Sequence, residues 1–269
     1  MSLKIGFIGC GKMAQAIIEG ILKSGYLTSE QIKATSKTIE TEKKVRERFN
    51  IPFGNTNQEV AEWADVLFLA VKPDIHNEVI TEIRDYIREN TVIITIAAGI
   101  TLHTLEDLFG KKIKAARSMP NTPSLVGEGM TAICVNDFVN VEEQAEIIDI
   151  FKTFGKVELV QESLMDSIPA ISGSSPAYVY MFIEALADGG VKQGISREKA
   201  YKLAAQAVLG AAKMVLETGK HPGELKDEVC TPGGATIEAV STLEEKGLRA
   251  AVLAAMESCT VKTKSLSKD

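Results

Sequence analysis

The chain has 269 residues, of which 45% are hydrophobic and 25% are charged, fractions that are ordinary for a globular protein. Its formal net charge of -6 at pH 7 disfavours a nucleic-acid-binding protein, since such proteins usually carry a basic stripe. Its cysteines (Cys10, Cys134, Cys230 and Cys259) form no C-x-x-C pair, which disfavours a zinc site and a disulfide framework. No segment has the layout of a signal peptide or of a membrane span, so we expect a cytosolic protein with reduced thiols and no metal.

Short β-rich runs alternate with helical patterns in the N-terminal part of the chain. Residues 66–71 and 92–97 are continuous apolar runs, which are typical of strands buried on both faces of a parallel sheet. This alternation predicts a doubly wound, Rossmann-type α/β domain over residues 1–162. The predicted strands are 4–8, 32–35, 66–71, 92–97, 114–117 and 130–135, and the predicted helices are 13–23, 39–49 and 74–89.

The pattern changes beyond residue 162, where strand signals almost vanish. We therefore predict a second, all-α domain over residues 163–269, with helices at 176–192 and 248–264 and one between them. Such apolar helix faces usually pack into a core, but an alanine-rich helical domain also suits dimerisation. The apolar stripe of the middle helix consists of Ala200, Leu203, Ala204, Ala207, Val208, Ala211, Met214 and Val215.

A glycine-rich turn joins the first predicted strand to the first predicted helix. Gly9 and Gly11 begin a G-x-G-x-x-A motif that ends at Ala14. The first glycine permits a tight turn, the second lets a pyrophosphate approach the backbone, and the helix N-terminus offers free N–H donors. The letters alone also suit a turn without a ligand, but their position favours a dinucleotide site. The predicted contacts here are Ile8, Gly9, Cys10, Gly11, Lys12 and Met13.

The end of the second predicted strand bears on which dinucleotide binds. NAD sites usually carry an Asp or Glu about 20 residues after the glycines, whereas residues 34–38 contain no acid. Ser36 and Lys37 can donate hydrogen bonds to a 2′-phosphate instead, although Lys37 also suits an ordinary solvated loop. We therefore predict NADP(H) in preference to NAD(H).

Other predicted cofactor contacts lie in loops that follow buried strands. Ligands of open α/β sheets bind beyond the carboxyl ends of the strands. The glycine of the second loop permits a close approach of the chain to the cofactor, whereas the lysine of the first also suits a surface position. These predicted contacts are Asn57, Ala70, Val71, Lys72, Pro73, Ala98 and Gly99.

Two segments of small residues, 172–177 and 231–236, stand at predicted helix starts in the second domain. Helix capping and turn formation account for such residues in isolation. The adjacent glycines Gly233 and Gly234 at a helix N-terminus would also make a carboxylate site. Thr231 and Thr236 would place hydroxyl groups beside it.

These motifs together resemble those of the pyrroline-5-carboxylate reductase family. The resemblance runs over nearly the whole chain, and the segments 185–190 and 232–236 are its most specific parts. Ser175 departs from the pattern, since the family commonly has glycine there. The segments concerned are Gly6–Ala14, Ala64–Pro73, Met119–Pro123, Ser172–Ala177, Ala185–Gly190 and Pro232–Thr236.

The resemblance implies reduction of a five-membered cyclic imine acid, 1-pyrroline-5-carboxylate, to L-proline by hydride from NADPH. It implies that Thr231, Gly233, Gly234 and Ala235 bind the substrate carboxylate, and that Glu162 lies near the substrate. Thr236 would hydrogen-bond the substrate nitrogen and act as the catalytic proton donor; a water relay is an equal alternative because a threonine hydroxyl is a weak acid. The resemblance also implies homodimers formed through the helical domain, assembled into larger rings in some members.

Two rival interpretations stay open. A β-hydroxyacid-type dehydrogenase has the same domain plan, but it needs a base, often a lysine on the first long helix of the helical domain. Here that helix is apolar until Asp188, and Lys192 comes only at its far end. A non-catalytic NADP-binding scaffold would have no reason for the segment 232–236.

Overall fold

The computed structural model describes residues 3–266 and divides into two compact units. The first unit comprises the residues up to Ser174 and those from Cys259 onward, and the second comprises Ser175–Ser258. The domain boundary predicted after Glu162 lies before the division between Ser174 and Ser175. The assignment of one domain to the cofactor and the other to the substrate stays a prediction. Residues 1–2 and 267–269 of the predicted domains lie outside the described part of the chain.

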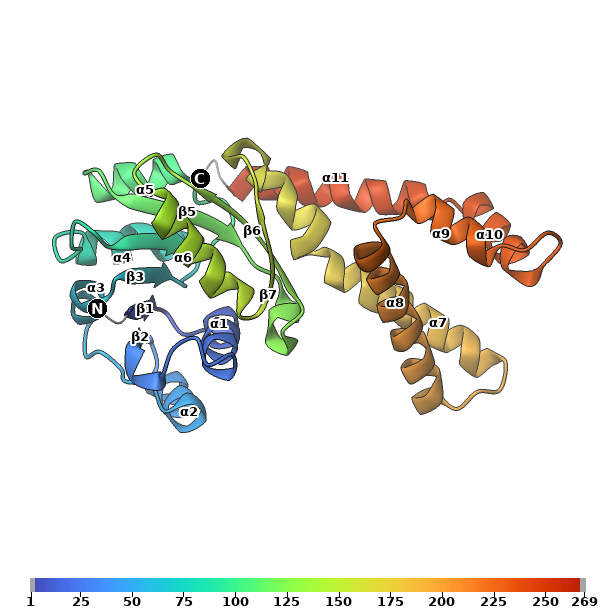
Figure 1. Cartoon of the computed structure of the whole chain (residues 1–269), viewed down its shortest axis with the longest axis horizontal. Helices are drawn as coiled ribbons and strands as arrows, with labels where there is room; N and C mark the ends of the chain where they lie inside the picture. The colour runs from blue at the N-terminus through green and yellow to red at the C-terminus, as the bar shows by residue number, and fades with distance from the viewer. Residues whose placement is uncertain (1–2, 267–269) are drawn as a thin grey trace. The chain divides into compact units, whose positions relative to one another are not determined.

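A seven-stranded sheet forms the centre of the first unit, with strand order β2-β1-β3-β4-β5-β6-β7 (Figure 1). The first five strands are parallel, whereas β6 is antiparallel to β5 and β7 is parallel to β6. This parallel-dominated sheet with helices confirms the predicted Rossmann-type domain. The strands are β1 (Ile5–Ile8), β2 (Ile32–Thr35), β3 (Val66–Leu69), β4 (Val92–Thr95), β5 (Lys114–Met119), β6 (Gly129–Val135) and β7 (Gly155–Leu159).

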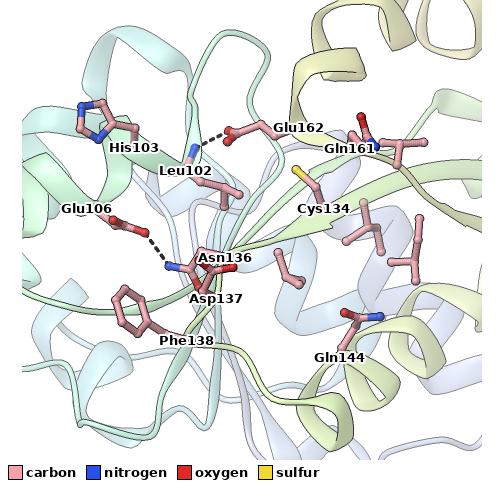
Figure 2. Close-up of a pocket in the computed structure, with 14 residues that line it drawn as sticks. Leu102, His103, Glu106, Cys134, Asn136, Asp137, Phe138, Gln144, Gln161 and Glu162 are labelled. Atoms are coloured by element: carbon pink, nitrogen blue, oxygen red, sulfur yellow. Dashed lines mark hydrogen bonds between the residues drawn. The ribbon is translucent and has the colours of Figure 1, made fainter.

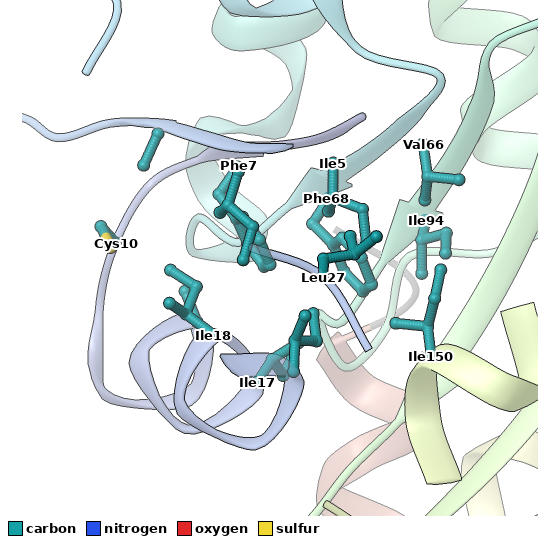
Figure 3. Packing of buried hydrophobic residues seen from close by; sticks show 14 of the residues in the cluster. Ile5, Phe7, Cys10, Ile17, Ile18, Leu27, Val66, Phe68, Ile94 and Ile150 are labelled. Atoms are coloured by element: carbon teal, nitrogen blue, oxygen red, sulfur yellow. The ribbon is translucent and has the colours of Figure 1, made fainter. Parts of the chain in front are cut away.

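Side chains alternate between two hydrophobic clusters on opposite faces of the sheet, as the two-residue period of a strand requires. Phe7 and Phe68 stack on one face with their ring centroids 4.8 Å apart (Figure 3). Their cluster includes residues of the helices α1 (Lys12–Lys23), α2 (Ile39–Phe49) and α6 (Val141–Lys152). Leu67 and Leu69 belong to the other cluster, with α3, α4 and α5. Because both faces are covered, every residue of β3 and β4 is buried.

Six helices cover this sheet, and the sequence predicted three of them. The predicted helix 74–89 is shorter in the structure, because a 3-10 turn (Pro73–Ile75) precedes it and it ends at Ile83. The predicted strands 66–71 and 92–97 likewise stop two residues early, which leaves loops at the carboxyl edge of the sheet. The helices are α1 (Lys12–Lys23), α2 (Ile39–Phe49), α3 (Asn57–Trp63), α4 (His76–Ile83), α5 (Leu102–Phe109) and α6 (Val141–Lys152).

The regular elements of the second unit, within Ser175–Ser258, are all helical, as predicted. The expectation that the α8 stripe packs into a core of the same chain is wrong for most of its length. Ala200 and Ala204 are buried, but Leu203 is 61% exposed and Met214 is 49% exposed. The unit provides too few facing helices to cover this face. The helices are α7 (Ser175–Lys192), α8 (Arg197–Thr218), α9 (Pro222–Val229), α10 (Ala235–Glu245) and α11 (Leu248–Leu266), the last of which continues into the first unit.

Helix length and hydropathy also bear on membrane insertion. Within residues 3–266, no helix combines the length and the apolar character that are needed to cross a bilayer.

Candidate active site

The turn between β1 and α1 has the shape of a phosphate cradle. Gly9 has a φ of +88°, a conformation that favours glycine, and a Cβ atom there would lie 2.6 Å from the carbonyl oxygen of Ala70. At Gly11 the space is open, because nothing lies within 4 Å of the place where a Cβ would stand. The turn therefore needs the first glycine for its own geometry and leaves the second open to a ligand.

The N-terminus of α1 supplies backbone donors at this turn. Gly11 is its N-cap, no side chain caps the helix, and its first turn contains no acidic residue. The free N–H groups and the positive end of the dipole of this 12-residue helix favour an anion. Gln15 fixes the turn by donating from Nε2 to the carbonyl oxygen of Cys10 at 2.9 Å. These residues fit the pyrophosphate of a dinucleotide.

A cavity of about 260 Å³ lies beyond the carboxyl ends of β1, β2 and β3, where the sequence predicts the cofactor. A second cavity of about 400 Å³ shares Thr35, Ser36, Asn57 and Glu82 with it. The first cavity brings together the predicted contacts Ile8, Gly9, Ser36, Lys37, Asn57 and Val71. The predicted contacts Cys10, Gly11, Lys12, Met13, Ala70, Lys72, Pro73, Ala98 and Gly99 line neither of the two cavities and stay predictions.

Asn57 is held at both ends of its amide where the two cavities meet. Its Oδ1 accepts a hydrogen bond from Thr35 Oγ1 at 2.7 Å, and its Nδ2 donates to Glu82 Oε2 at 2.7 Å. Sequence reasoning missed this glutamate, since it lies on α4 and meets the end of β2 only through the fold. An acid therefore stands beside the predicted 2′-phosphate region even though residues 34–38 contain none.

Arg46 is a second lining residue that the sequence did not single out. Its Nε donates to Glu42 Oε1 at 2.8 Å, and its guanidinium lies 5.0 Å from the ring centroid of Phe53. Both it and Glu42 line the larger cavity. Its place in the last turn of a charged surface helix gives no local signal of a site, so only the packing of α2 beside β2 shows it.

The two loops after β3 and β4 lie at the same edge of the sheet as the glycine turn. Ala70 N–H donates to the Ile8 carbonyl at 2.8 Å, which ties the first loop to the end of β1. Lys72 is exposed at the start of the 3-10 turn. In the second loop, Gly99 has a φ of +84°, which favours glycine there. The backbone of the first loop is therefore bonded to the end of β1, and the second loop contains a turn that favours glycine.

The predicted carboxylate segment forms the start of α10 in the second unit. Gly233 has a φ of +68°, and Gly234 is the N-cap, so no side chain caps the helix. A Cβ on Gly234 would lie 2.3 Å from Thr231 Oγ1, and its N–H donates to the Thr231 carbonyl at 3.0 Å. The structure thus brings Thr231, the two glycines and the start of α10 together. Glu238 is the acidic residue of the first turn.

Glu162 lines a cavity of about 570 Å³ beside β6 and β7, and none of the predicted cofactor residues lines this cavity (Figure 2). Its Oε1 accepts from the backbone N–H of Leu102 at 2.6 Å and lies 3.7 Å from Nη1 of the buried Arg117. Arg117 Nη2 also bonds Asp166 Oδ1 at 2.5 Å. The Glu162 carboxylate is therefore held at the N-terminus of α5, which begins three residues after Gly99. The contact of Glu162 with the substrate stays a prediction.

Asn121 explains part of the Met119–Pro123 motif. It is buried, its Nδ2 donates to the Ser172 carbonyl at 2.9 Å, and its Oδ1 accepts from Met130 N–H at 2.9 Å. It thus ties the loop after β5 to the start of β6 and to the small-residue segment before α7. The sequence offered this motif only as part of a resemblance.

Thiol chemistry does not suit the two buried cysteines of the first unit. Burial raises the pKa of Cys10 to about 12. Burial and the nearby Glu162 carboxylate raise the pKa of Cys134 to about 11. Both thiols stay protonated near neutral pH and are therefore poor nucleophiles.

Two protein-family models match separate parts of the chain. The model described as pyrroline-5-carboxylate reductase dimerisation matches residues 162–266. The model described as NADP oxidoreductase, coenzyme F420-dependent, matches residues 4–99.

Whole-chain comparisons give one consistent family. The chain is 49% identical to a pyrroline-5-carboxylate reductase of Escherichia coli over 268 residues, covering 100% of both proteins. It is 41% identical to one of Methanosarcina acetivorans over 98% of each protein. A solved pyrroline-5-carboxylate reductase of Coxiella burnetii superimposes with a TM-score of 0.93 at 34% identity over 100% of both chains. The Plasmodium falciparum enzyme, solved with NADP bound, gives a TM-score of 0.88 at 35% identity, covering 99% of this chain and 98% of its own. The chain belongs to the pyrroline-5-carboxylate reductase family.

Proposed function

We propose that the protein reduces 1-pyrroline-5-carboxylate to L-proline with hydride from NADPH, the last step of proline biosynthesis. The observation that carries this proposal is the match, over the whole chain, to enzymes that bear this name. The N-termini of α1 and α10, which no side chain caps, support the proposal. Such helix N-termini bind anions, and the reaction needs sites for two of them, the pyrophosphate of the cofactor and the carboxylate of the substrate.

The first unit would hold the cofactor. The N–H groups from Gly11 to Met13 would bind the pyrophosphate, and Ile8, Gly9, Asn57 and the Ala70–Pro73 loop would line the rest of the site. Ala98 and Gly99 would contact the cofactor from the β4 loop. When bound, the cofactor supplies the hydride.

The second unit would hold the substrate. The backbone around Gly233, Gly234 and Ala235 would bind its carboxylate, beside the Thr231 hydroxyl. Thr236 would hydrogen-bond its nitrogen, at which a proton must be present in the product. A protonated imine is already electrophilic, so the site needs orientation and charge placement more than a strong acid. A water relay through Thr236 serves as well as direct donation.

Preference for NADPH over NADH is part of the proposal. Residues 34–38, at the end of β2, contain no acid, and Ser36 and Lys37 line the cavity there. Both can donate hydrogen bonds to a 2′-phosphate. The negative charge of Glu82 would repel a 2′-phosphate, but its Oε2 already accepts a hydrogen bond from the amide of Asn57.

We further propose a homodimer formed through the helical unit, able to assemble into a larger ring, and a location in the cytoplasm. The exposed apolar side chains of that unit support the dimer. Leu216 is 80% exposed, Met181 69% and Leu253 66%, and several largely exposed apolar side chains in one unit are typical of an interface.

The test is an assay that follows NADPH oxidation with pyrroline-5-carboxylate as substrate. We expect turnover that depends on both compounds and yields proline. If the protein instead oxidised a β-hydroxyacid with NADP, or bound NADPH with no turnover of either substrate, the proposal would be wrong. The assay thus separates the reductase from both the dehydrogenase and the scaffold.

A further inference from the structure

We propose that His76 is a positioning residue that holds together the two loops after β3 and β4, and so sets the affinity of the protein for NADPH. This inference rests on the proposed function, because those two loops are the proposed cofactor contacts Ala70–Pro73 and Ala98–Gly99. His76 itself lines neither cavity beside them.

His76 is the first residue of α4 and is 1% exposed. Its Nδ1 lies 3.0 Å from the carbonyl oxygen of Lys72, in the β3 loop. Its Nε2 lies 3.1 Å from Oγ1 of Thr95, the last residue of β4. Thr95 Oγ1 in turn accepts from the backbone N–H of Ala97 at 3.2 Å. One imidazole therefore bridges the backbones of both loops.

The partners fix the direction of every bond in this chain. A carbonyl oxygen only accepts, so Nδ1 carries a hydrogen and donates to Lys72. In a neutral ring Nε2 is then an acceptor, which takes the hydroxyl hydrogen of Thr95 while the same oxygen accepts from Ala97. A second ring proton would leave that hydroxyl hydrogen without this acceptor. With a neutral imidazole, every hydrogen of the bridge therefore has an acceptor.

The surroundings keep the ring neutral. Burial lowers the pKa of His76, and the Lys72 carbonyl and the Asp74 carboxylate oppose this only in part. On the β4 and β5 side, Thr95 makes the bond described, and Ser118 Oγ donates to the Thr95 carbonyl at 2.9 Å. The charged group on this side is Arg117, the register partner of Thr95, whose guanidinium bonds Asp166 and lies 3.7 Å from Glu162 Oε1.

An apolar side chain would fill this buried place without any polar partner. Burying polar groups costs free energy, which their hydrogen bonds offset only in part. A buried polar bridge therefore points to a role in positioning the segments that it connects. Here the ends of the bridge are backbone atoms at Lys72 and Ala97, both within the loops that face the cofactor. The bridge therefore acts on loop geometry rather than on the stability of α4 alone.

The test breaks the bridge at Thr95, which touches no proposed ligand. Thr95→Val removes the hydroxyl at nearly constant volume, and Thr95→Ser retains it. Thr91→Val is the matched control: this buried threonine precedes the same strand, and its Oγ1 donates to the Ala64 carbonyl at 3.0 Å, at the opposite edge of the sheet. The dissociation constant of NADPH is measured by fluorescence titration, beside the melting temperature and the KM and kcat of the full-length protein.

We expect Thr95→Val to weaken NADPH binding about fivefold to tenfold, as the loss of one buried hydrogen bond gives. Thr95→Ser should stay within about twofold of the wild type, and Thr91→Val should lower the melting temperature without weakening NADPH binding. If Thr95→Val does not fold, His76→Met serves the same test. If both single variants fold, the double variant should bind NADPH as tightly as whichever single variant binds it less tightly, because both changes break the same bridge.

Equal NADPH affinity for Thr95→Val and Thr95→Ser would overturn the inference and leave the proposed function standing. Equal weakening by Thr91→Val would do the same, since the effect would then follow from lost stability. A wild-type protein that binds no NADPH would overturn the proposed function, and the inference with it.

Discussion

Gly9 lies so close to Ala70 that a Cβ on the glycine would stand 2.6 Å from the carbonyl oxygen of the alanine. The same Cβ would stand 2.8 Å from Val71 Cγ1. The glycine turn and the loop after β3 are therefore packed backbone against backbone. Since both are proposed to contact the cofactor, a change at Gly9 must disturb the two together.

Gly9→Ala should reduce the free energy of unfolding by about 2 kcal/mol or more and abolish measurable NADPH binding. The left-handed φ costs about 1–2 kcal/mol for a residue with a Cβ, and the clash adds to it. Gly25→Ala is the matched control, since Gly25 also has a positive φ (+69°) but nothing lies within 4 Å of its Cβ position. Chemical denaturation and NADPH titration of both variants provide the measurement. If the Gly9→Ala protein bound NADPH as tightly as the control, the glycine turn would not be the pyrophosphate site.

Replacing Ser36 should change the cofactor preference. Ser36→Glu places a carboxylate where the 2′-phosphate is proposed to bind and should lower kcat/KM with NADPH by about 10-fold to 100-fold, the worth of a charge-assisted hydrogen bond plus repulsion. Activity with NADH should fall far less. Glu82→Gln, which removes the opposing charge nearby, should favour NADPH. An unchanged NADPH/NADH ratio in Ser36→Glu would rule out this site for the phosphate.

Thr236→Ala should lower kcat, because the hydroxyl is proposed to hold the substrate nitrogen. We expect a loss of about 10-fold to 100-fold, within the range that general acid–base groups contribute. Thr242→Ala is the control on the same helix, since Thr242 Oγ1 donates to the Glu238 carbonyl at 3.1 Å, away from the N-terminus. Steady-state kinetics at saturating NADPH measure both. If Thr236→Ala turned over like the wild type, the residue would have no part in the reaction.

The charge state of His76 should appear in the pH dependence of stability. Burial lowers its pKa in the folded protein from the ordinary value of 6.5, so below about pH 6.5 the unfolded chain binds a proton that the folded chain does not. Its contribution to stability is full above that pH and is lost as the pH falls further. The unfolding free energy of the wild type relative to His76→Met should therefore shrink between about pH 7.5 and about pH 5.5. A constant difference over this range would contradict a neutral buried imidazole.

The exposed stripe of α8 should contribute to self-association. Leu203→Glu places a charge on a side chain that is 61% exposed in the single chain and should shift the protein toward monomers in sedimentation velocity runs at low micromolar concentration. Ile39→Glu is the control, since Ile39 is 72% exposed on α2 of the first unit. A wild-type protein that sedimented as a monomer would remove the proposed dimer.

The buried strands could be predicted because their apolar runs need no knowledge of the fold. β7 was missed because it is half exposed, with Lys156 and Glu158 among its residues, so it leaves no apolar run. The helices α3, α5 and α6 were missed although local signals exist: Thr56 caps α3 by accepting from Glu59 N–H, and Asn140 forms a capping box with α6.

The candidate site was predictable where it depends on local backbone geometry, as at Gly9 and Gly233. It was not predictable where side chains from distant segments meet. Glu82 reaches Asn57 from α4, and His76 reaches Thr95 across 19 residues of sequence. Such pairs follow from the packing of α3 and α4 on the sheet, which residue types and spacing do not give.

The most direct test of the account is a crystal structure of the protein with NADP and L-proline. We expect the pyrophosphate on the N–H groups at the start of α1 and the proline carboxylate at Gly233–Thr236. The Cδ atom of proline, which is the carbon of the former C=N bond, should lie about 3.5 Å from the nicotinamide. Proline bound away from α10, or a nicotinamide that no α10 segment approaches, would contradict the account.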